Sequence, residues 1–283
     1  MFRILFCSSS TLLLALSMAL PSLAMAGNAF KFNGATFEQV PGTVSQISVA
    51  DDGAVWAVDS NQRVFHLVPG RDRFEQITGN LKQISVGSRS HIWGVSAASK
   101  AYRFDGSVFV NVPGSFSQIS VGADGAVWAV SPSKQVYRYN AGNKIFEGIS
   151  GRFDSIAVGS ANAVWGLDRS SGKAFKYNPS TKLFVPVPGS FSEISVGADG
   201  SAWAINASGQ IFRYDAGAKL MRSVAGNLSR ISVGSSTNVW GVNARSEVFR
   251  LQGSNFVPVP GKLQQVDAGK SSPNGGGAWG VSP

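Results

Sequence analysis

The chain has 283 residues and a formal net charge of +9, although only 14% of its residues are charged. Hydrophobic residues make up 43%, which is enough for a packed core and argues against general disorder. One cysteine and two histidines exclude a disulfide framework and argue against a zinc or haem centre, so we expect neither a metal nor a cofactor.

The first 26 residues have the features of a signal peptide. Arg3 supplies the positive charge, residues 11–20 form the apolar segment, and Ala24 and Ala26 provide small side chains for cleavage. A retained membrane anchor is the alternative, but the apolar segment is short for a membrane span. We therefore predict cleavage near Ala26, a secreted or periplasmic protein that does not span the membrane, and a single domain over residues 27–283.

A repeat of 35 to 39 residues runs through the rest of the chain, and each copy contains one tryptophan. The seven are Trp56, Trp93, Trp128, Trp165, Trp203, Trp240 and Trp279. Each copy also contains short runs of β-forming residues, such as 118–122 and 136–139, separated by Gly, Pro, Asn and Asp. No stretch shows a sustained helical period, so we predict four antiparallel strands per copy and no helix.

Four-stranded units repeated in this way predict an all-β, seven-bladed β-propeller. The order of the runs along the chain indicates that the last blade combines two inner strands from residues 264–282 with two outer strands from residues 29–40. A linear solenoid is the alternative, but it would need capping repeats at its ends, and none is visible. The copies also alternate in sequence, which suggests that a two-blade module was duplicated.

A basic residue recurs at one position in the strand after each tryptophan strand: Lys31, His66, Arg103, Arg138, Lys176, Arg213 and Arg250. Gly209 suits the left-handed position of a three-residue hairpin loop, which makes Asn206 and Gln210 the closing pair and places Trp203 opposite Arg213. The pair has two interpretations. The indole fills the wedge between blades with the cation on its face, or it stacks on a sugar ring while the arginine binds hydroxyl groups.

The repeats resemble those of the tectonin family. The matching residues are the Ile-Ser-Val-Gly run at 119–122, 194–197 and 231–234, the Val-Trp-Gly-Val run at 239–242, and the aromatic–basic–aromatic strands at 137–139 and 212–214. The family's frequent Asn after Trp-Gly-Val is present as Asn206 and Asn243. The resemblance implies a propeller that binds glycans between its blades, including O-methylated sugars or lipopolysaccharide.

We therefore predict a multivalent lectin that is not an enzyme. Its candidate ligand-binding residues are the seven tryptophans, Arg103, Arg138, Arg213, Arg250, Asn206 and Asn243. The expected partners are glycans or lipopolysaccharide and anionic surfaces, because the charge is positive, whereas the absence of a dense Lys/Arg cluster argues against nucleic acid. The alternative function is a non-catalytic scaffold that binds another protein.

The turns contain two further groups of candidate residues. His91 is expected to be a turn residue, which leaves little for a Ser-His-Asp arrangement. The Asp-Gly turns at Asp52, Asp124 and Asp199 each lack the dense carboxylates of a calcium loop.

Overall fold

Short strands bounded by turn-forming residues follow one another through the whole described part of the chain. The computed structural model describes residues 27–269 and 277–283, which form 28 strands and no helix. Within these residues no helix has the length and hydrophobicity needed to cross a membrane. The predicted signal peptide lies outside the described residues.

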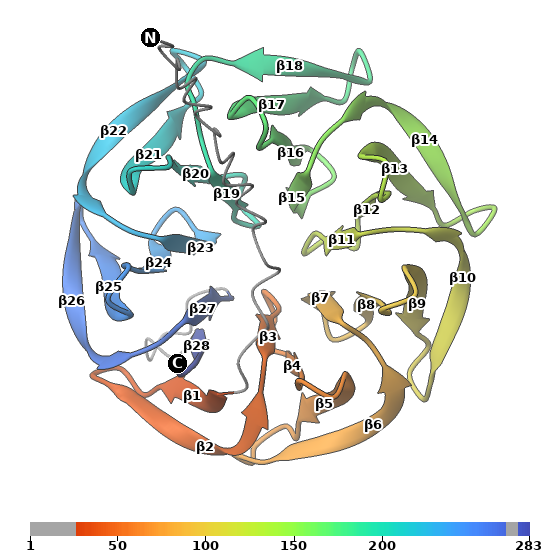
Figure 1. The fold of residues 1–283 in the computed structure, drawn as a ribbon, viewed down its shortest axis with the longest axis vertical. Coiled ribbons are helices and arrows are strands. Elements are labelled where there is room, and N and C mark those ends of the chain that lie inside the picture. Colours follow the sequence, from red (N-terminus) through yellow and green to blue (C-terminus); the bar gives the residue numbers. More distant parts are fainter. Residues whose placement is uncertain (1–26, 270–276) are drawn as a thin grey trace, which may run out of the picture.

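The strands form seven four-stranded antiparallel sheets, which surround a common axis as the blades of a propeller (Figure 1). Blades one to six take four consecutive strands each, from β3–β6 to β23–β26, and blade seven consists of β27, β28, β1 and β2. The first strand of each blade lies nearest the axis: β3 (Gln46–Val49), β7 (Gln83–Ser88), β11 (Gln118–Val121), β15 (Ser155–Ser160), β19 (Glu193–Val196), β23 (Arg230–Ser235) and β27 (Gln265–Ala268). The second strands carry the tryptophans: β4 (Val55–Val58), β8 (His91–Val95), β12 (Val127–Val130), β16 (Ala163–Asp168), β20 (Ala202–Ile205), β24 (Asn238–Val242) and β28 (Ala278–Val281).

The third and fourth strands complete each blade toward its outer edge. The third strands are β5 (Arg63–Leu67), β9 (Lys100–Phe104), β13 (Gln135–Asn140), β17 (Lys173–Asn178), β21 (Gln210–Asp215), β25 (Glu247–Gln252) and β1 (Gly27–Phe32). The fourth strands are β6 (Phe74–Asn80), β10 (Phe109–Ser115), β14 (Ile145–Arg152), β18 (Leu183–Val187), β22 (Leu220–Asn227), β26 (Asn255–Lys262) and β2 (Phe37–Val44).

Blade seven closes the ring by joining the two ends of the chain. Strand β1 pairs with β28 so that Ala29 lies opposite Val281 and Lys31 opposite Trp279. The sheet order β2-β1-β28-β27 confirms the predicted two-plus-two closure. Closure leaves no blade without a neighbour, which protects the sheet faces in place of capping repeats.

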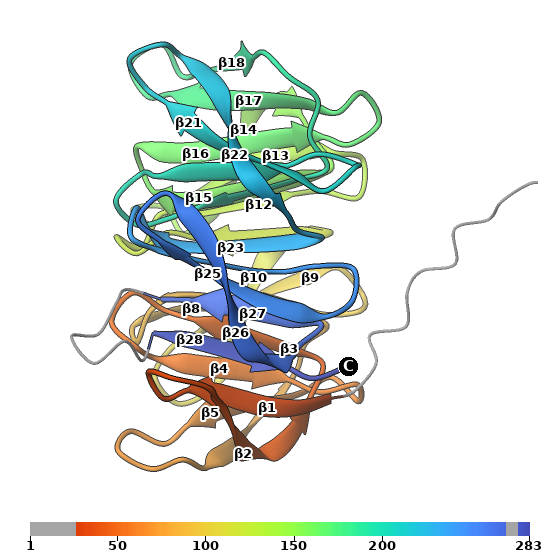
Figure 2. The ribbon, with the colours of Figure 1, turned by 90° about the vertical axis from the view of Figure 1, so that its left-hand side faces the viewer.

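The blades form a disc whose two faces carry different turns (Figure 2). Because strands alternate in direction, the turns between first and second strands and those between third and fourth strands share one face, here called the groove face. The turns between second and third strands lie on the opposite face, together with the start of β1 and the end of β28; this is the termini face.

The hydrophobic core is divided into clusters that lie between neighbouring blades. One cluster, for example, joins Trp165 and Leu167 of blade four to Ala202 of blade five. At the axis a glycine near the end of the inner strand permits close approach in every blade but the first, which has Ala50: a Cβ on Gly87 would collide with the carbonyl of Gly122 in the next blade. The glycine of the Ile-Ser-Val-Gly run is therefore required by blade spacing.

Candidate functional site

The tryptophans are wedges between blades. All seven side chains are buried, with 0–6% of their surface exposed. Each indole contacts bulky side chains of the next blade; the ring of Trp128 lies 4.7 Å from that of Tyr177 and 6.0 Å from that of Phe184, centroid to centroid. The prediction that these indoles stack on a sugar ring is corrected by this burial, because no indole face is available to a ligand. The packing interpretation accounts for all seven.

The basic residues opposite the tryptophans do reach solvent. Their predicted register is observed in every blade, from Lys31 opposite Trp279 to Arg250 opposite Trp240. Arg103, Arg138 and Arg213 are exposed, and the guanidinium carbon of Arg138 lies 5.8 Å from the Trp128 ring. Such a cation–π contact is worth about 0.5–2 kcal/mol. The basic residue thus places a positive charge at the surface, next to a buried indole.

A hollow of about 440 Å³ opens beside Arg138 on the groove face. Blade three contributes Asp124, Arg138, Asn140 and Glu147, and blade four contributes Ala161. Hydrogen bonds from Asn140 (2.7 Å) and Asn143 lower the pKa of Glu147, with a smaller effect of the nearby Arg138. The hollow therefore presents an ionised carboxylate, a guanidinium and an amide, which together can bind several hydroxyl groups.

The next groove, between blades four and five, holds a hollow of about 470 Å³. Its polar side chains include Asn162, Lys176 and Asn178 of blade four, and Tyr214 and Lys219 of blade five. The ammonium of Lys176 lies 4.9 Å from the centre of the Tyr214 ring. Burial, with a smaller contribution from Asp215, raises the pKa of Tyr214, so its hydroxyl stays protonated at neutral pH and can donate a hydrogen bond.

Asn206 and Asn243 are separated from these two hollows. Each closes a turn on the termini face: Asn206 accepts from the amide of Gln210 at 2.9 Å, and Asn243 accepts from the amide of Glu247 at 3.0 Å. Three residues of strand, roughly 10 Å, separate the Asn206 turn from Arg213. The two asparagines and the basic position are therefore not brought into one site. A hollow of about 390 Å³ between blades two and three includes Ser131, which occupies the equivalent position.

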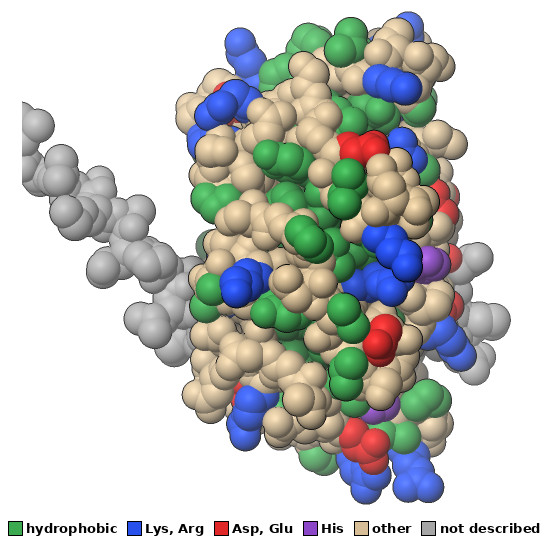
Figure 3. Space-filling model, turned by 90° about the vertical axis from the view of Figure 1, so that its right-hand side faces the viewer, with side chains coloured by type: hydrophobic (Ala, Val, Ile, Leu, Met, Phe, Trp, Pro, Cys, Tyr) green, Lys and Arg blue, Asp and Glu red, His purple; other side chains and the backbone are tan. Residues whose placement is uncertain are grey.

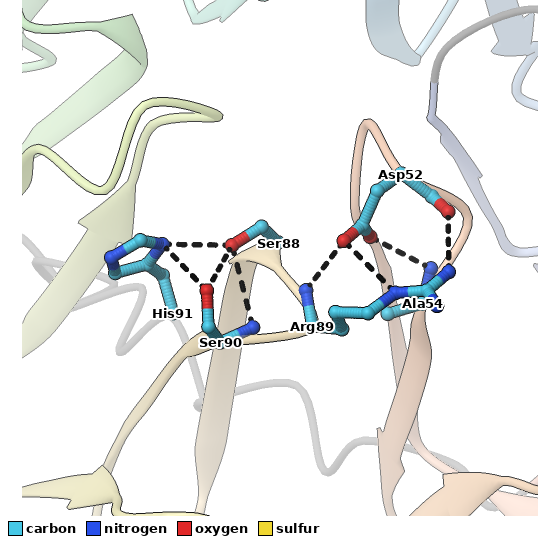
Figure 4. Close-up of polar contacts among 6 residues, drawn as sticks. All are labelled: Asp52, Ala54, Ser88, Arg89, Ser90 and His91. Carbon is cyan, nitrogen blue, oxygen red and sulfur yellow. Dashed lines mark hydrogen bonds and ion pairs between the residues drawn. The ribbon is translucent and has the colours of Figure 1, made fainter.

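The Asp-Gly turns link neighbouring blades. Asp52 accepts from the amide of Ala54 in its own turn and from the amide of Arg89 in blade two, at 3.2 and 2.9 Å (Figure 4). Asp124 and Asp199 form the equivalent bonds to Ala161 and Ser236 at 2.8 and 2.7 Å. The aspartates therefore stabilise contacts between blades, a role that their sequence spacing alone did not reveal.

The expectation that His91 is a turn residue is wrong, because His91 is the first residue of β8, directly after the turn at Arg89 and Ser90. Its Nδ1 contacts the Ser88 hydroxyl at 2.7 Å (Figure 4). Its ring packs over Gly125 of blade three. The carboxylate of Asp52 binds Arg89, so these serine, histidine and aspartate side chains do not form a triad.

Sequence reasoning missed several residues of the two hollows, namely Glu147, Asn162, Asn178, Tyr214 and Lys219. Two of them lie next to a recognised position: Asn178 follows the aromatic–basic–aromatic strand of its blade, and Tyr214 follows Arg213. For these two the signal was their position at the end of the third strand, whereas Glu147 lies on a fourth strand and Asn162 and Lys219 lie in turns.

The fold is shared with solved propellers of very different sequence. The structure titled "YCF48 bound to D1 peptide" has 14% identity and a TM-score of 0.63, and the match covers 90% of this chain and 96% of that one. The streptogramin B lyase structure has 15% identity and a TM-score of 0.63, with 92% and 99% covered. At these identities the likeness extends to the fold alone.

No curated protein sequence matches the chain significantly. The model of the tectonin domain, by contrast, matches residues 22–104, 96–243 and 220–283, which together span the repeats described above. The chain belongs to the tectonin family.

Proposed function

We propose that the protein is a secreted, non-catalytic lectin that binds surface glycans in the grooves between its blades. The observation that carries this proposal is the groove between blades four and five, where Lys176, Asn178 and Tyr214 converge on one hollow. Its volume of about 470 Å³ lies within the usual range for small-ligand sites. Cationic side chains at both hollows favour glycans that carry phosphate or carboxylate, such as lipopolysaccharide, and the apolar lining from Val185 and Pro186 suits an O-methyl group.

Binding at each groove is expected to be weak, because most hydrogen bonds to a sugar replace hydrogen bonds to water. Several grooves that meet a repeated surface glycan would raise the apparent affinity by about 10²–10⁴. The alternation of the blades favours a subset of working grooves.

A glycan array followed by calorimetry with a monovalent sugar tests the proposal. Lys176→Ala and Arg138→Ala should each remove sites and lower the stoichiometry or weaken affinity about tenfold, because bonds to charged groups are the stronger ones. Lys100→Ala is the matched control, since this exposed lysine begins β9 on the termini face. No heat with any sugar, including methylated ones and lipopolysaccharide fragments, would reject the lectin.

The second candidate is a scaffold that binds another protein. One observation favours it: the structurally similar YCF48 is described as bound to a peptide. Retention of such a partner by the Lys176→Ala and Arg138→Ala variants, with no sugar bound by the parent, would support the scaffold.

A further inference from the structure

Three neighbouring blades present the same four-residue loop on the groove face. The loops cover residues 141–144, 179–182 and 216–219, between the third and fourth strands of blades three, four and five. Each is preceded by an Asn or Asp whose side-chain oxygen accepts from an amide within the loop, as Asn140 does from Gly142 at 2.9 Å. The three loops follow one another along one arc of the rim (Figure 1).

Each of these loops ends in a lysine followed by an aliphatic residue: Lys144–Ile145, Lys182–Leu183 and Lys219–Leu220. We call this set the Lys–aliphatic arc. The lysines have φ angles of +59°, +57° and +55°, a conformation that glycine adopts more readily. Ile145 and Leu183 are 45% and 53% exposed, so their side chains point largely into solvent.

The opposite arc of the ring, in blades six, seven and one, has a different composition. There the position that corresponds to the aliphatic residue, directly before the bulky aromatic residue of the fourth strand, is occupied by Asn255, Thr36 or Arg73. The hairpins of the third and fourth strands in blades three to five carry nine Lys/Arg against two carboxylates, Glu147 and Asp215; those of blades six, seven and one carry six against four. Asp215 is already paired with Arg222, and Glu147 is bonded by Asn140. Positive charge and exposed aliphatic surface therefore coincide on one side of the disc.

The wider distribution of exposed apolar side chains follows the same side. Among the described residues, the exposed large hydrophobics are Val108, Val110, Ile145, Leu183 and Val185, all in blades two to four. Figure 3 views this side and shows hydrophobic side chains reaching the surface between Lys and Arg.

We propose that the Lys–aliphatic arc docks the disc edge-on against an anionic lipid surface. Long lysine side chains can reach phosphate headgroups while a neighbouring aliphatic side chain enters the boundary with the acyl chains. Lysine is depleted and aromatic residues are enriched at protein interfaces, so a convex rim of Lys, Ile and Leu fits a lipid surface better than a protein partner. The proposal is independent of glycan binding, because the lipid needs no sugar.

Vesicle co-sedimentation tests the arc with the chain from residue 27, which holds every described strand. The parent should sediment with vesicles of mixed phosphatidylglycerol and phosphatidylcholine, remain in solution with pure phosphatidylcholine, and be released by salt. Lys144→Gln combined with Lys182→Gln should weaken partitioning by about fivefold for each lysine removed. Arg71→Gln combined with Arg73→Gln removes two charges from the corresponding loop of blade one and should leave partitioning within about twofold, because those arginines lie on the opposite arc.

Ile145→Ser combined with Leu183→Ser tests the apolar part and should weaken binding even at low salt. All variants should unfold at the temperature of the parent, since these side chains are exposed. Equal losses in the two charge variants would show that net charge alone acts and would overturn the arc. Failure of the parent to bind anionic vesicles would also overturn it, as would self-association that Ile145→Ser and Leu183→Ser abolish without any lipid binding.

Discussion

Two neighbouring junctions between blades are built from equivalent strands but are held together by different contacts. Between blades five and six, three side chains of the first blade bind backbone amides of the next: Glu193 to Ile231, Ser195 to Val233, and Asp199 to Ser236, at 3.0, 3.0 and 2.7 Å. Between blades four and five the equivalent residues are Ser155, Ala157 and Ala161. Among the described residues the side chains at these three positions accept no hydrogen bond from an amide of blade five, and Ile194 there is half-buried whereas Ile231 is buried.

The comparison shows which part of the repeat carries blade cohesion. Apolar wedges are retained at both junctions, with Trp165 against Tyr214 and Trp203 against Phe256. The hydrogen bonds from backbone amides to side chains of the preceding blade, here called polar bridges, are dispensable at a single junction, because closure of the ring holds the two blades in place. The unbridged junction contains the hollow beside Lys176 and Tyr214, but the bridged junction between blades three and four contains a hollow of similar volume, so a groove forms with or without the polar bridges.

The largest loss of stability is expected from opening the ring. This change tests whether ring closure holds the unbridged junction between blades four and five together. Deletion of residues 27–44 removes β1 and β2 and exposes sheet edges and both flanking clusters of blade seven. Cooperative thermal unfolding should be lost, measured by calorimetry. Deletion of residues 1–26 is the control and should leave the transition intact. A truncated protein that melts like the parent would refute closure as the source of cohesion.

The next largest loss of stability is expected from removing the buried tryptophan at either junction. Trp203→Ala and Trp165→Ala should each cost about 3–5 kcal/mol of unfolding free energy, because each removes a buried indole. Trp165→Ala should lie at the upper end, since no polar bridge supports its junction. Urea denaturation measures both. A loss of sugar binding without a loss of stability would restore the indole as a contact residue.

A smaller effect is expected from exchanging the polar bridges. Ser155→Gln, Ala157→Ser and Ala161→Asp together should stabilise the protein by about 1–3 kcal/mol and slow amide exchange at Ile194. The reciprocal control, Glu193→Ser with Ser195→Ala and Asp199→Ala, should lose a similar amount and speed exchange at Ile231. Unchanged exchange in both sets would show that the bridges do not govern cohesion.

The sequence predicted the fold well because the repeat carries strong local signals. The hairpin at Gly209, with its φ of +82°, fixes the register that places Trp203 opposite Arg213, as expected. Strand order and closure followed from counting the runs, since a four-stranded blade cannot bury its faces alone.

The site was less predictable because burial and partner choice depend on the neighbouring blade. The repeat pattern does not show that Tyr177 and Phe184 cover Trp128, and so it left the indoles as contact residues. In the same way, the Asn206 side chain is used by its own turn, a local hydrogen-bonding choice that a motif match cannot reveal.

The smallest effect concerns the ring's closing junction, where a carboxyl occupies the position that is alanine in blade four and serine in the other blades. Asp267 accepts from the amide of Val49 at 2.8 Å and from the hydroxyl of Ser232 at 2.8 Å, and so joins blade seven to blades one and six. Burial raises the pKa of Asp267 above its ordinary 3.8, despite these bonds. The folded protein therefore holds this proton more tightly than the unfolded chain does.

The sign of the pH dependence follows from that difference. The contribution of a protonated Asp267 is fully present below pH 3.8, its unfolded pKa, and is lost as the pH rises through the higher folded value. Asp267→Ser removes the buried charge and keeps an acceptor for Val49, as Ser48 does for Val86 at 3.1 Å. The variant should be more stable than the parent by about 1 kcal/mol at neutral pH, because a buried carboxylate is costly to desolvate. This advantage should shrink as the pH falls toward 4, in paired urea titrations of parent and variant. A difference that is constant with pH would show that Asp267 is no more strongly protonated in the folded ring than in the unfolded chain.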